Sequence, residues 1–204
     1  LIVIMSVMSG FRAALLDAML GGQGHVFVFT QDEPQESVED LVNRIEALPE
    51  VDQAMPIIEQ QVLATSDRRQ SGAIVRVEDL DNLPFLDGGA DAARGIGFGE
   101  GMNGGDTILV GRFLAAELGL YPGDKLTLIA PNGIQGPFGV TPRRKTYTVG
   151  QFFQTGSVEL AQLYILMPVE QAQLFFGRKG VYDKLDLRVP EPMNTDPAES
   201  AVQR

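Results

Sequence analysis

Glu78, Asp79, Asp81 and Asp87 place several carboxylates in one short stretch of the sequence, and clustered carboxylates are the ligands that Ca²⁺ prefers. A calcium-binding loop also needs a glycine at its sixth position and a glutamate at its twelfth. Counted from Asp79 or from Asp81, the sequence meets neither requirement. We therefore interpret the cluster as a solvated acidic loop, and we predict no metal ion and no other cofactor.

Other patterns that could support catalysis are weak. Residues 95–101 are rich in glycine, but a dinucleotide-binding fingerprint needs a preceding strand and a following helix, so we predict a flexible surface loop there. A Ser–His–Asp triad would have to use His25, the only histidine, which lies in a β-rich run. Because cysteine is absent, thiolate nucleophiles and thiolate metal sites are excluded. The sequence thus predicts a protein that is not an enzyme.

The charge of the chain narrows the class of partner. The 204 residues include 16 Lys and Arg against 27 Asp and Glu, which gives a net charge of −11. Binding to phosphate backbones requires clustered Lys and Arg, so we expect no nucleic-acid partner. The 44% of hydrophobic residues is near the globular average and argues against a disordered chain.

One segment departs from this acidic background. Residues 135–145 read Gln-Gly-Pro-Phe-Gly-Val-Thr-Pro-Arg-Arg-Lys and end in the cations Arg143, Arg144 and Lys145. Phe138 stands between a proline and a glycine, where the backbone can hold an aromatic ring outward, and the prolines limit the entropy that the segment loses on docking. An exposed aromatic flanked by cations is typical of a protein-binding hot spot. The alternative, which the residues support equally, is that Phe138 packs back onto its own barrel.

Both ends of the sequence have the pattern of interrupted helices. Residues 1–8 are apolar and an apolar stripe continues to Gly21 and Gly22, so we interpret residues 1–24 as the end of a first transmembrane helix and a juxtamembrane helix. The alternative is a buried N-terminal helix of a soluble domain. Asp196-Pro-Ala-Glu is a helix-capping pattern with few residues after it, which indicates a truncated helix.

Between these ends, short apolar runs separated by turn residues predict a β-rich chain with a few short helices. Gly119 and Gly177 follow helical stripes and are expected to be C-caps. Residues 130–144 contain many Pro and Gly, which predicts an irregular segment. The predicted strands cover residues 25–29, 55–65, 73–77, 107–110, 125–129, 146–153, 163–167 and 184–189, and the predicted helices cover residues 37–48, 112–118 and 168–176.

A strand followed by Glu-Pro and a capped helix occurs twice, at residues 25–37 and at residues 184–196. Two strand–helix units therefore bracket a β-rich middle. This arrangement predicts an α+β fold, in which both ends of the chain build one split α/β subdomain and a β-rich subdomain is inserted between them.

Several stretches resemble the LolC/LolE family, the permease subunits of the lipoprotein-releasing ABC transporter of Gram-negative bacteria. Individually they are moderately specific, but their order and spacing extend the resemblance along nearly the whole chain. The stretches are the start, Leu-Ile-Val-Ile-Met-Ser-Val-Met-Ser-Gly-Phe-Arg, then Val110-Gly-Arg-Phe-Leu-Ala-Ala-Glu-Leu-Gly-Leu with Pro122-Gly-Asp-Lys, and Leu166-Met-Pro with Gln171-Ala-Gln.

The resemblance implies a MacB-type periplasmic domain between the first two helices of an inner-membrane protein. Such a domain has a porter-like α/β part and a sabre-like β-rich part. On this basis we assign residues 25–65 and 181–204 to the porter-like part, truncated at its C-terminal end. Residues 66–180 become the sabre-like part, with a hook loop at residues 131–145.

In the LolC-like branch, the resemblance implies a protruding hook that binds the periplasmic carrier LolA and passes lipoprotein to it. The branch that lacks this pattern is LolE, so the chain is placed with LolC or with a hook-bearing variant such as LolF. A LolE-like permease or a second copy, and a separate LolD-like ATPase, are the other implied partners. Val140 stands where a basic residue is common in the hook. The implied hook residues are Gln135, Gly136, Pro137, Phe138, Gly139, Val140, Thr141, Pro142 and Arg143.

Two alternatives remain at this point. A MacB-like or FtsX-like domain would share the fold but transmit force to another periplasmic partner, and residues 135–143 would distinguish it. A ligand-binding or enzymatic β-barrel is suggested by the turn Gly119-Leu-Tyr-Pro-Gly-Asp-Lys, which several barrel families share.

Overall fold

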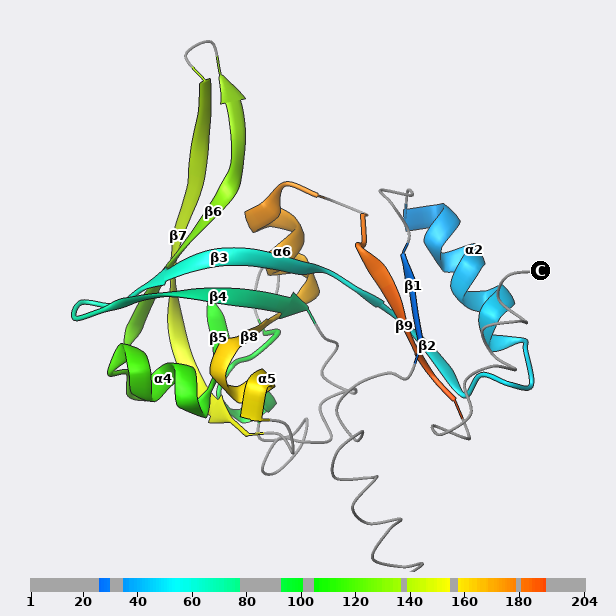
Figure 1. Cartoon of the computed structure of the whole chain (residues 1–204), viewed down its shortest axis with the longest axis horizontal. Helices are drawn as coiled ribbons and strands as arrows, with labels where there is room; N and C mark the ends of the chain where they lie inside the picture. Colours follow the sequence, from blue (N-terminus) through cyan, green and yellow to red (C-terminus); the bar gives the residue numbers. More distant parts are fainter. Residues whose placement is uncertain are drawn as a thin grey trace, which may run out of the picture.

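The computed structural model of the chain describes residues 26–29, 35–77, 93–100, 105–136, 139–154, 158–178 and 181–189. The expected N-terminal membrane helix, His25, the acidic cluster at residues 78–87 and the helix expected from Asp196 lie outside these residues. Among the described helices, none is both long and apolar enough to cross a membrane. The described elements form an open sheet and a closed barrel (Figure 1).

The open sheet combines strands from both ends of the described chain. Helix α2 (Gln35–Glu46) packs against it in Figure 1. Val38 and Ile45 of this helix are seven positions apart, on one helical face, and belong to the same buried cluster as Leu187. This arrangement confirms the predicted α+β fold with a split α/β part. In spatial order the strands are β1 (Val26–Phe29), β9 (Lys184–Arg188) and β2 (Gln53–Ile57), with both pairs antiparallel.

The barrel is built by the chain between β2 and β9, and its strands neighbour one another in the order β3-β4-β8-β5-β7-β6. Short helices α4 (Arg112–Leu118), α5 (Val158–Leu163) and α6 (Val169–Phe176) accompany it. The strands are β3 (Glu59–Thr65), β4 (Gln70–Val77), β5 (Thr107–Gly111), β6 (Lys125–Gly136), β7 (Gly139–Phe153) and β8 (Tyr164–Met167).

The expected limit between the two parts at residue 65 is wrong. Strand β3 pairs with β4 and β6 inside the barrel, so the chain leaves the sheet at Ile58. No Gly or turn sequence separates β2 from β3, because the chain continues from one sheet into the other without reversing (Figure 1). Strands β3 and β4, which overlap the strands predicted at residues 55–65 and 73–77, pair as an antiparallel hairpin. The predicted C-caps Gly119 (φ 67°) and Gly177 (φ 66°) are confirmed. Helix α5 was not predicted.

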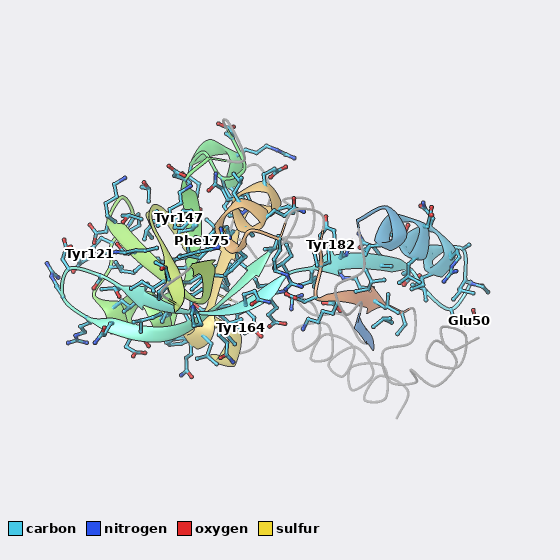
Figure 2. All side chains as sticks on the ribbon, turned by 90° about the horizontal axis from the view of Figure 1, so that it is seen from above. Glu50, Tyr121, Tyr147, Tyr164, Phe175 and Tyr182 are labelled. Carbon is cyan, nitrogen blue, oxygen red and sulfur yellow. The ribbon has the colours of Figure 1, made fainter. Side chains whose placement is uncertain are left out.

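Alternate residues of the barrel strands pack into its interior. Leu126, Leu128 and Ala130 of β6 and Tyr147 and Val149 of β7 are at most 1% exposed. A barrel with this few strands has an interior that side chains fill. Figure 2 places the rings of Tyr147 and Phe175 together inside this unit, where they meet edge to face with centroids 5.9 Å apart.

The sheet and the barrel meet at Glu59, the first residue of β3. Its carboxylate pairs with Lys184 of β9 and accepts a hydrogen bond from the hydroxyl of Tyr164 on β8. Burial raises the pKa of the Glu59 carboxyl, but the hydrogen bonds from Lys184 and Tyr164 and the charges of Lys184 and Arg76 outweigh burial. The pKa of Glu59 therefore lies below its usual value.

We expect Gly111→Ala to destabilise the barrel by about 1–3 kcal/mol, since overpacking in a rigid site has that magnitude. A Cβ at this position would lie 2.4 Å from the carbonyl oxygen of Ala161. The control is Gly72→Ala on β4, where a Cβ would meet nothing within 4 Å. Urea denaturation of both variants measures the difference, and equal free energies of unfolding would contradict the tight contact.

We also expect the Glu59 pairing to make stability depend on pH. Because the folded-state pKa is lowered, the stabilisation is complete above the ordinary value of 4.5 and is lost as the pH falls through the folded-state pKa. Glu59→Gln lacks this titration, so the gap in unfolding free energy between wild type and variant should narrow from about pH 6 to about pH 3. Denaturation curves across that range test this, and a constant gap would contradict it.

Candidate partner-binding hairpin

Strands β6 and β7 continue past the barrel as a paired hairpin. Their register runs from Lys125 opposite Thr148 in the barrel to Gly136 opposite Gly139 beside the tip. Figure 1 shows this hairpin projecting away from the rest of the molecule. The prediction of an irregular segment at residues 130–144 is therefore wrong, and the expected hook loop is a β-hairpin. Its tip, residues 137–138, lies outside the described residues.

A bulge marks the point where the hairpin leaves the barrel. The register shifts between Ala130 and Ile134, so residues 131–133 lie opposite Pro142. Proline has no N–H to donate, which suits a bulge. A Cβ on Gly133 would lie 1.7 Å from the carbonyl oxygen of Thr141, so the two backbones approach as closely as only glycine allows. The Pro and Gly that suggested irregular structure instead build a bulge, and a bulge bends and twists its strand.

Arg143, which was expected in the hook, reaches back to helix α6. Its Nη1 lies 3.5 Å from the carbonyl oxygen of Leu174. A Cβ on Gly177 would lie 2.2 Å from Nη2 of Arg143, so the guanidinium rests against the C-cap of α6. The last carbonyls of a helix carry partial negative charge and attract a cation. Arg143 thus braces the base of the hairpin against α6.

Lys145 is held on the same side of β7. Its Nζ lies 2.6 Å from Oε1 of Gln171, 2.7 Å from Oδ1 of Asp106 and 5.0 Å from the centroid of the Tyr147 ring. Because side chains alternate along a strand, Arg143, Lys145 and Tyr147 share one face. Burial raises the pKa of the Tyr147 hydroxyl, and the nearby charge of Asp106 raises it further. The charged groups of Arg143 and Lys145 thus contact other parts of the protein at the hairpin base.

Arg144 lies on the opposite face of β7, which is exposed to solvent. Within the described ranges, no hydrogen bond or ion pair joins its side chain to another residue, while its backbone belongs to the ladder opposite Ile129. On the same face, the hydroxyls of Thr127 and Thr146 are 2.8 Å apart, and Lys125 donates to Thr148 at 2.7 Å. The outer face of the hairpin base thus presents one exposed arginine beside a row of hydroxyl groups.

The predicted hook residues therefore have different surroundings. Thr141 and Pro142 are exposed on β7, whereas Arg143 is half-buried against α6. Sequence reasoning missed Leu174, which is 53% exposed beside this base. It also grouped Arg144 with its neighbours, and strand alternation would have separated them if a strand had been predicted. Gln135, Gly136, Gly139 and Val140 are the paired strand ends next to the tip, and Pro137 and Phe138 are the residues outside the description.

A buried aromatic and a polar recess lie elsewhere in the described part of the barrel. Phe98, within the glycine-rich stretch, is 1% exposed and packs in a second cluster with Leu109, which anchors the stretch to β5, while Gly95 and Gly99 lie on the surface. A polar recess of about 310 Å³ lies between the β3–β4 turn and residues 119–125, lined by cations and carboxylates alike. Within the described residues, no group of carboxylates and imidazoles could hold a metal ion.

The model of the MacB-like periplasmic core domain family matches residues 1–204. The chain is 27% identical over 211 residues to the lipoprotein-releasing system transmembrane protein LolC of Neisseria meningitidis serogroup B, an alignment that covers 99% of the chain and 48% of that protein. It is 28% identical over 184 residues to LolC of Xylella fastidiosa, covering 89% of the chain and 44% of that protein. The chain thus spans about half the length of these relatives.

Among solved structures, the periplasmic region of MacB from Actinobacillus actinomycetemcomitans is similar to this chain with a TM-score of 0.53. The two are 9% identical, and the match covers 93% of this chain and 86% of the other. At this identity the likeness concerns the fold alone, and it agrees with the α+β architecture described above.

We expect Gly177→Ala to release the hairpin base from α6. An alanine in the left-handed conformation costs about 1–2 kcal/mol, and here its Cβ would also displace the Arg143 guanidinium. Gly119→Ala is the matched control, because it caps α4 with the same conformation (φ 67°) but its Cβ would lie 3.7 Å from the nearest Arg68 atom. Hydrogen exchange should accelerate at the backbone amides of Thr141 and of residues 143–145 in Gly177→Ala alone. Equal exchange in the two variants would contradict the brace.

Proposed function

The chain belongs to the family of MacB-like periplasmic core domains, and from this we infer that it is the periplasmic domain of a LolC-like inner-membrane ABC transporter permease. We propose that the β6–β7 hairpin binds the periplasmic carrier LolA, so that a lipoprotein released from the inner membrane passes directly to it. The named relatives are lipoprotein-releasing transmembrane proteins, and their likeness to nearly the whole chain supports this reading.

The observation that carries the proposal is the hairpin itself. Strand β6 has 12 residues and β7 has 15, and their pairing continues beyond the barrel up to the residues beside the tip. A hairpin whose base is fixed by Arg143 and Lys145 has already lost much of the conformational freedom that docking would otherwise remove. The elements that hold it therefore favour binding by the tip.

Because side chains alternate along β7, we assign different roles to the residues of the hairpin. We assign carrier contact to residues 135–142, with Phe138 as the apolar anchor, and to Arg144 on the exposed face of the base. Arg143 holds the hairpin in place rather than touching the carrier. The exposed charge of Arg144 would steer an acidic partner surface and help to set the orientation of docking.

The transport mechanism is mechanical. In this proposal a separate LolD-like cytoplasmic subunit hydrolyses ATP, and a LolE-like permease or a second copy completes the transporter in the inner membrane. In the same proposal, this chain transmits movement and binds the carrier and takes no part in ATP hydrolysis. Each acyl CH₂ group exposed to water costs about 0.8 kcal/mol, so a carrier docked on the hairpin keeps the transfer path of the lipoprotein short and dry.

We expect Phe138→Ala and Arg144→Glu to weaken LolA binding, by about tenfold or more for the aromatic anchor. Isothermal titration of LolA into the purified protein measures the affinity. The Arg144 variant should act mainly through a slower association rate that depends on salt.

Tyr121→Ala is the control for Phe138→Ala. Tyr121 is an aromatic that is 66% exposed, and it precedes β6 at the end opposite the hairpin tip. Figure 2 places it on the side of the barrel that faces away from the sheet. Tyr121→Ala should leave the affinity for LolA unchanged. Affinity that persists after Phe138→Ala, or equal losses in both variants, would refute docking through the hairpin and favour a MacB-like or FtsX-like domain with another partner.

A further inference from the structure

The sheet and the barrel are connected by two crossing segments, and backbone hydrogen bonds hold each of them to a neighbouring strand. The first is Ile58, between β2 and β3, and the second runs from α6 to β9. The backbone N–H of Asp183 donates to the carbonyl of Ile57 at 2.9 Å, and that of Val77 donates to the carbonyl of Ile58 at 2.9 Å. The joint between the two units is thus ordered at the level of the backbone.

A buried ion pair crosses this joint. Arg76 lies on β4 of the barrel and Asp186 on β9 of the sheet, and their Nη2 and Oδ2 atoms are 2.8 Å apart. The side chains are 5% and 0% exposed. In the register of the barrel, Arg76 stands opposite Glu59 on the same face as the exposed Gly72, so it would face solvent if β9 did not cover it. The two units therefore bury this arginine between them.

Further charged groups surround the pair. Lys184 of β9 pairs with Glu59 of β3, as described above. Asp183 accepts hydrogen bonds from the backbone N–H of Glu59 at 2.8 Å and from Nε2 of Gln60 at 3.0 Å, and it pairs with Arg178 after α6. Residues 183, 184 and 186 of one segment thus hold several elements of the barrel at once.

A buried ion pair is a poor source of stability, because desolvation of the charges offsets their attraction and apolar residues of similar volume often serve as well. An ion pair instead fixes the relative orientation of the two elements that carry it, since a charge-assisted hydrogen bond forms only within a narrow range of distance and angle. At this joint, a small change in the angle between sheet and barrel displaces the hairpin by a large distance. A strand rises about 3.3 Å per residue, so β6 is roughly 40 Å long, and a tilt of about 10° would move a point 30 Å away by about 5 Å.

We propose that Arg76 and Asp186 are positioning residues that hold the barrel, and with it the hairpin, at one angle to the sheet. The role of that angle in cargo transfer rests on the proposed function. The sheet contains the first and the last described strands, so a movement that enters through the sheet reaches the hairpin tip without being lost at the joint.

The test compares wild type with the double variant Arg76→Met/Asp186→Leu. This variant replaces the ion pair by an apolar contact, which does not fix the orientation of the two strands. The chain contains no cysteine, so spin labels can be attached to Asn43→Cys on α2 and Thr141→Cys on β7, both exposed positions. In the full-length protein, with any cysteines elsewhere replaced, pulsed electron resonance measures the distance distribution between the labels. We expect one narrow distribution in wild type and at least a twofold broader one in the double variant, at an unchanged melting temperature.

Asp186→Asn serves if the double variant does not fold, because the amide has the same shape and one oxygen acceptor but no charge, and a broadening is expected there too. Arg69→Met is the control, since Arg69 joins two elements within the barrel by donating to the carbonyl of Glu117. It should leave the distribution narrow. A distribution that stays as narrow as wild type in the joint variants overturns the proposal.

A second readout separates positioning from folding and from the proposed function. The hairpin is intact in the joint variants, so carrier affinity should equal that of wild type, whereas lipoprotein transfer by the complete transporter should fall at least fivefold. Broader distances with normal transfer overturn the positioning role. If wild type itself does not bind the carrier, the proposed function fails, and the distance measurement still decides whether Arg76 and Asp186 fix the joint.

Discussion

The pairing of β6 with β7 both closes the barrel and builds the hairpin, and most other features of the molecule follow from it. Within the barrel, Leu126 and Leu128 are buried together with Tyr147, and a slip of one residue would turn each of these side chains out to solvent. The register is therefore fixed by the core. Beyond the bulge at residues 131–133 the pairing of the same two strands continues from Ile134 opposite Thr141 to Gly136 opposite Gly139. The barrel core thus fixes the strands from which the hairpin extends.

The same register decides which cations are available to a partner. Arg143 and Lys145 fall on the face that meets α6, where a helix C-terminus and Asp106 neutralise them. Arg144 falls on the other face beside the hydroxyls of Thr127 and Thr146. A run of three basic residues that reads in sequence as one patch is thus two internal contacts and one exposed charge. Of the three basic residues in this run, Arg144 is therefore the one whose charge is available to a partner.

Sequence reasoning succeeded where a local signal is tied to one physical cause. Gly119 and Gly177 end helices because each adopts the left-handed conformation, and both were predicted from the apolar stripes before them. It failed at residues 130–144, because a segment rich in Pro and Gly can form either an irregular loop or a bulge, and its composition does not distinguish the two. The contact of Gly133 with the Thr141 carbonyl depends on the partner strand. The pairing of Arg76 with Asp186 spans 110 positions, and no periodicity in a single sequence reports a contact of that range.

Two arginines stand at the two places where one unit of this fold continues into the next, Arg76 in a buried ion pair and Arg143 half-buried against a helix end. Arg143 stands where the hairpin leaves the barrel and Arg76 where the barrel meets the sheet, and each guanidinium is directed at a fixed acceptor on the neighbouring element. Apolar burial is non-directional and lets packed surfaces slide, whereas a planar guanidinium is satisfied in few orientations. A domain that only bound its partner could tolerate sliding at both places. A domain that has to deliver a movement from a sheet to a distant tip cannot, because the angular errors of successive joints add along the same lever.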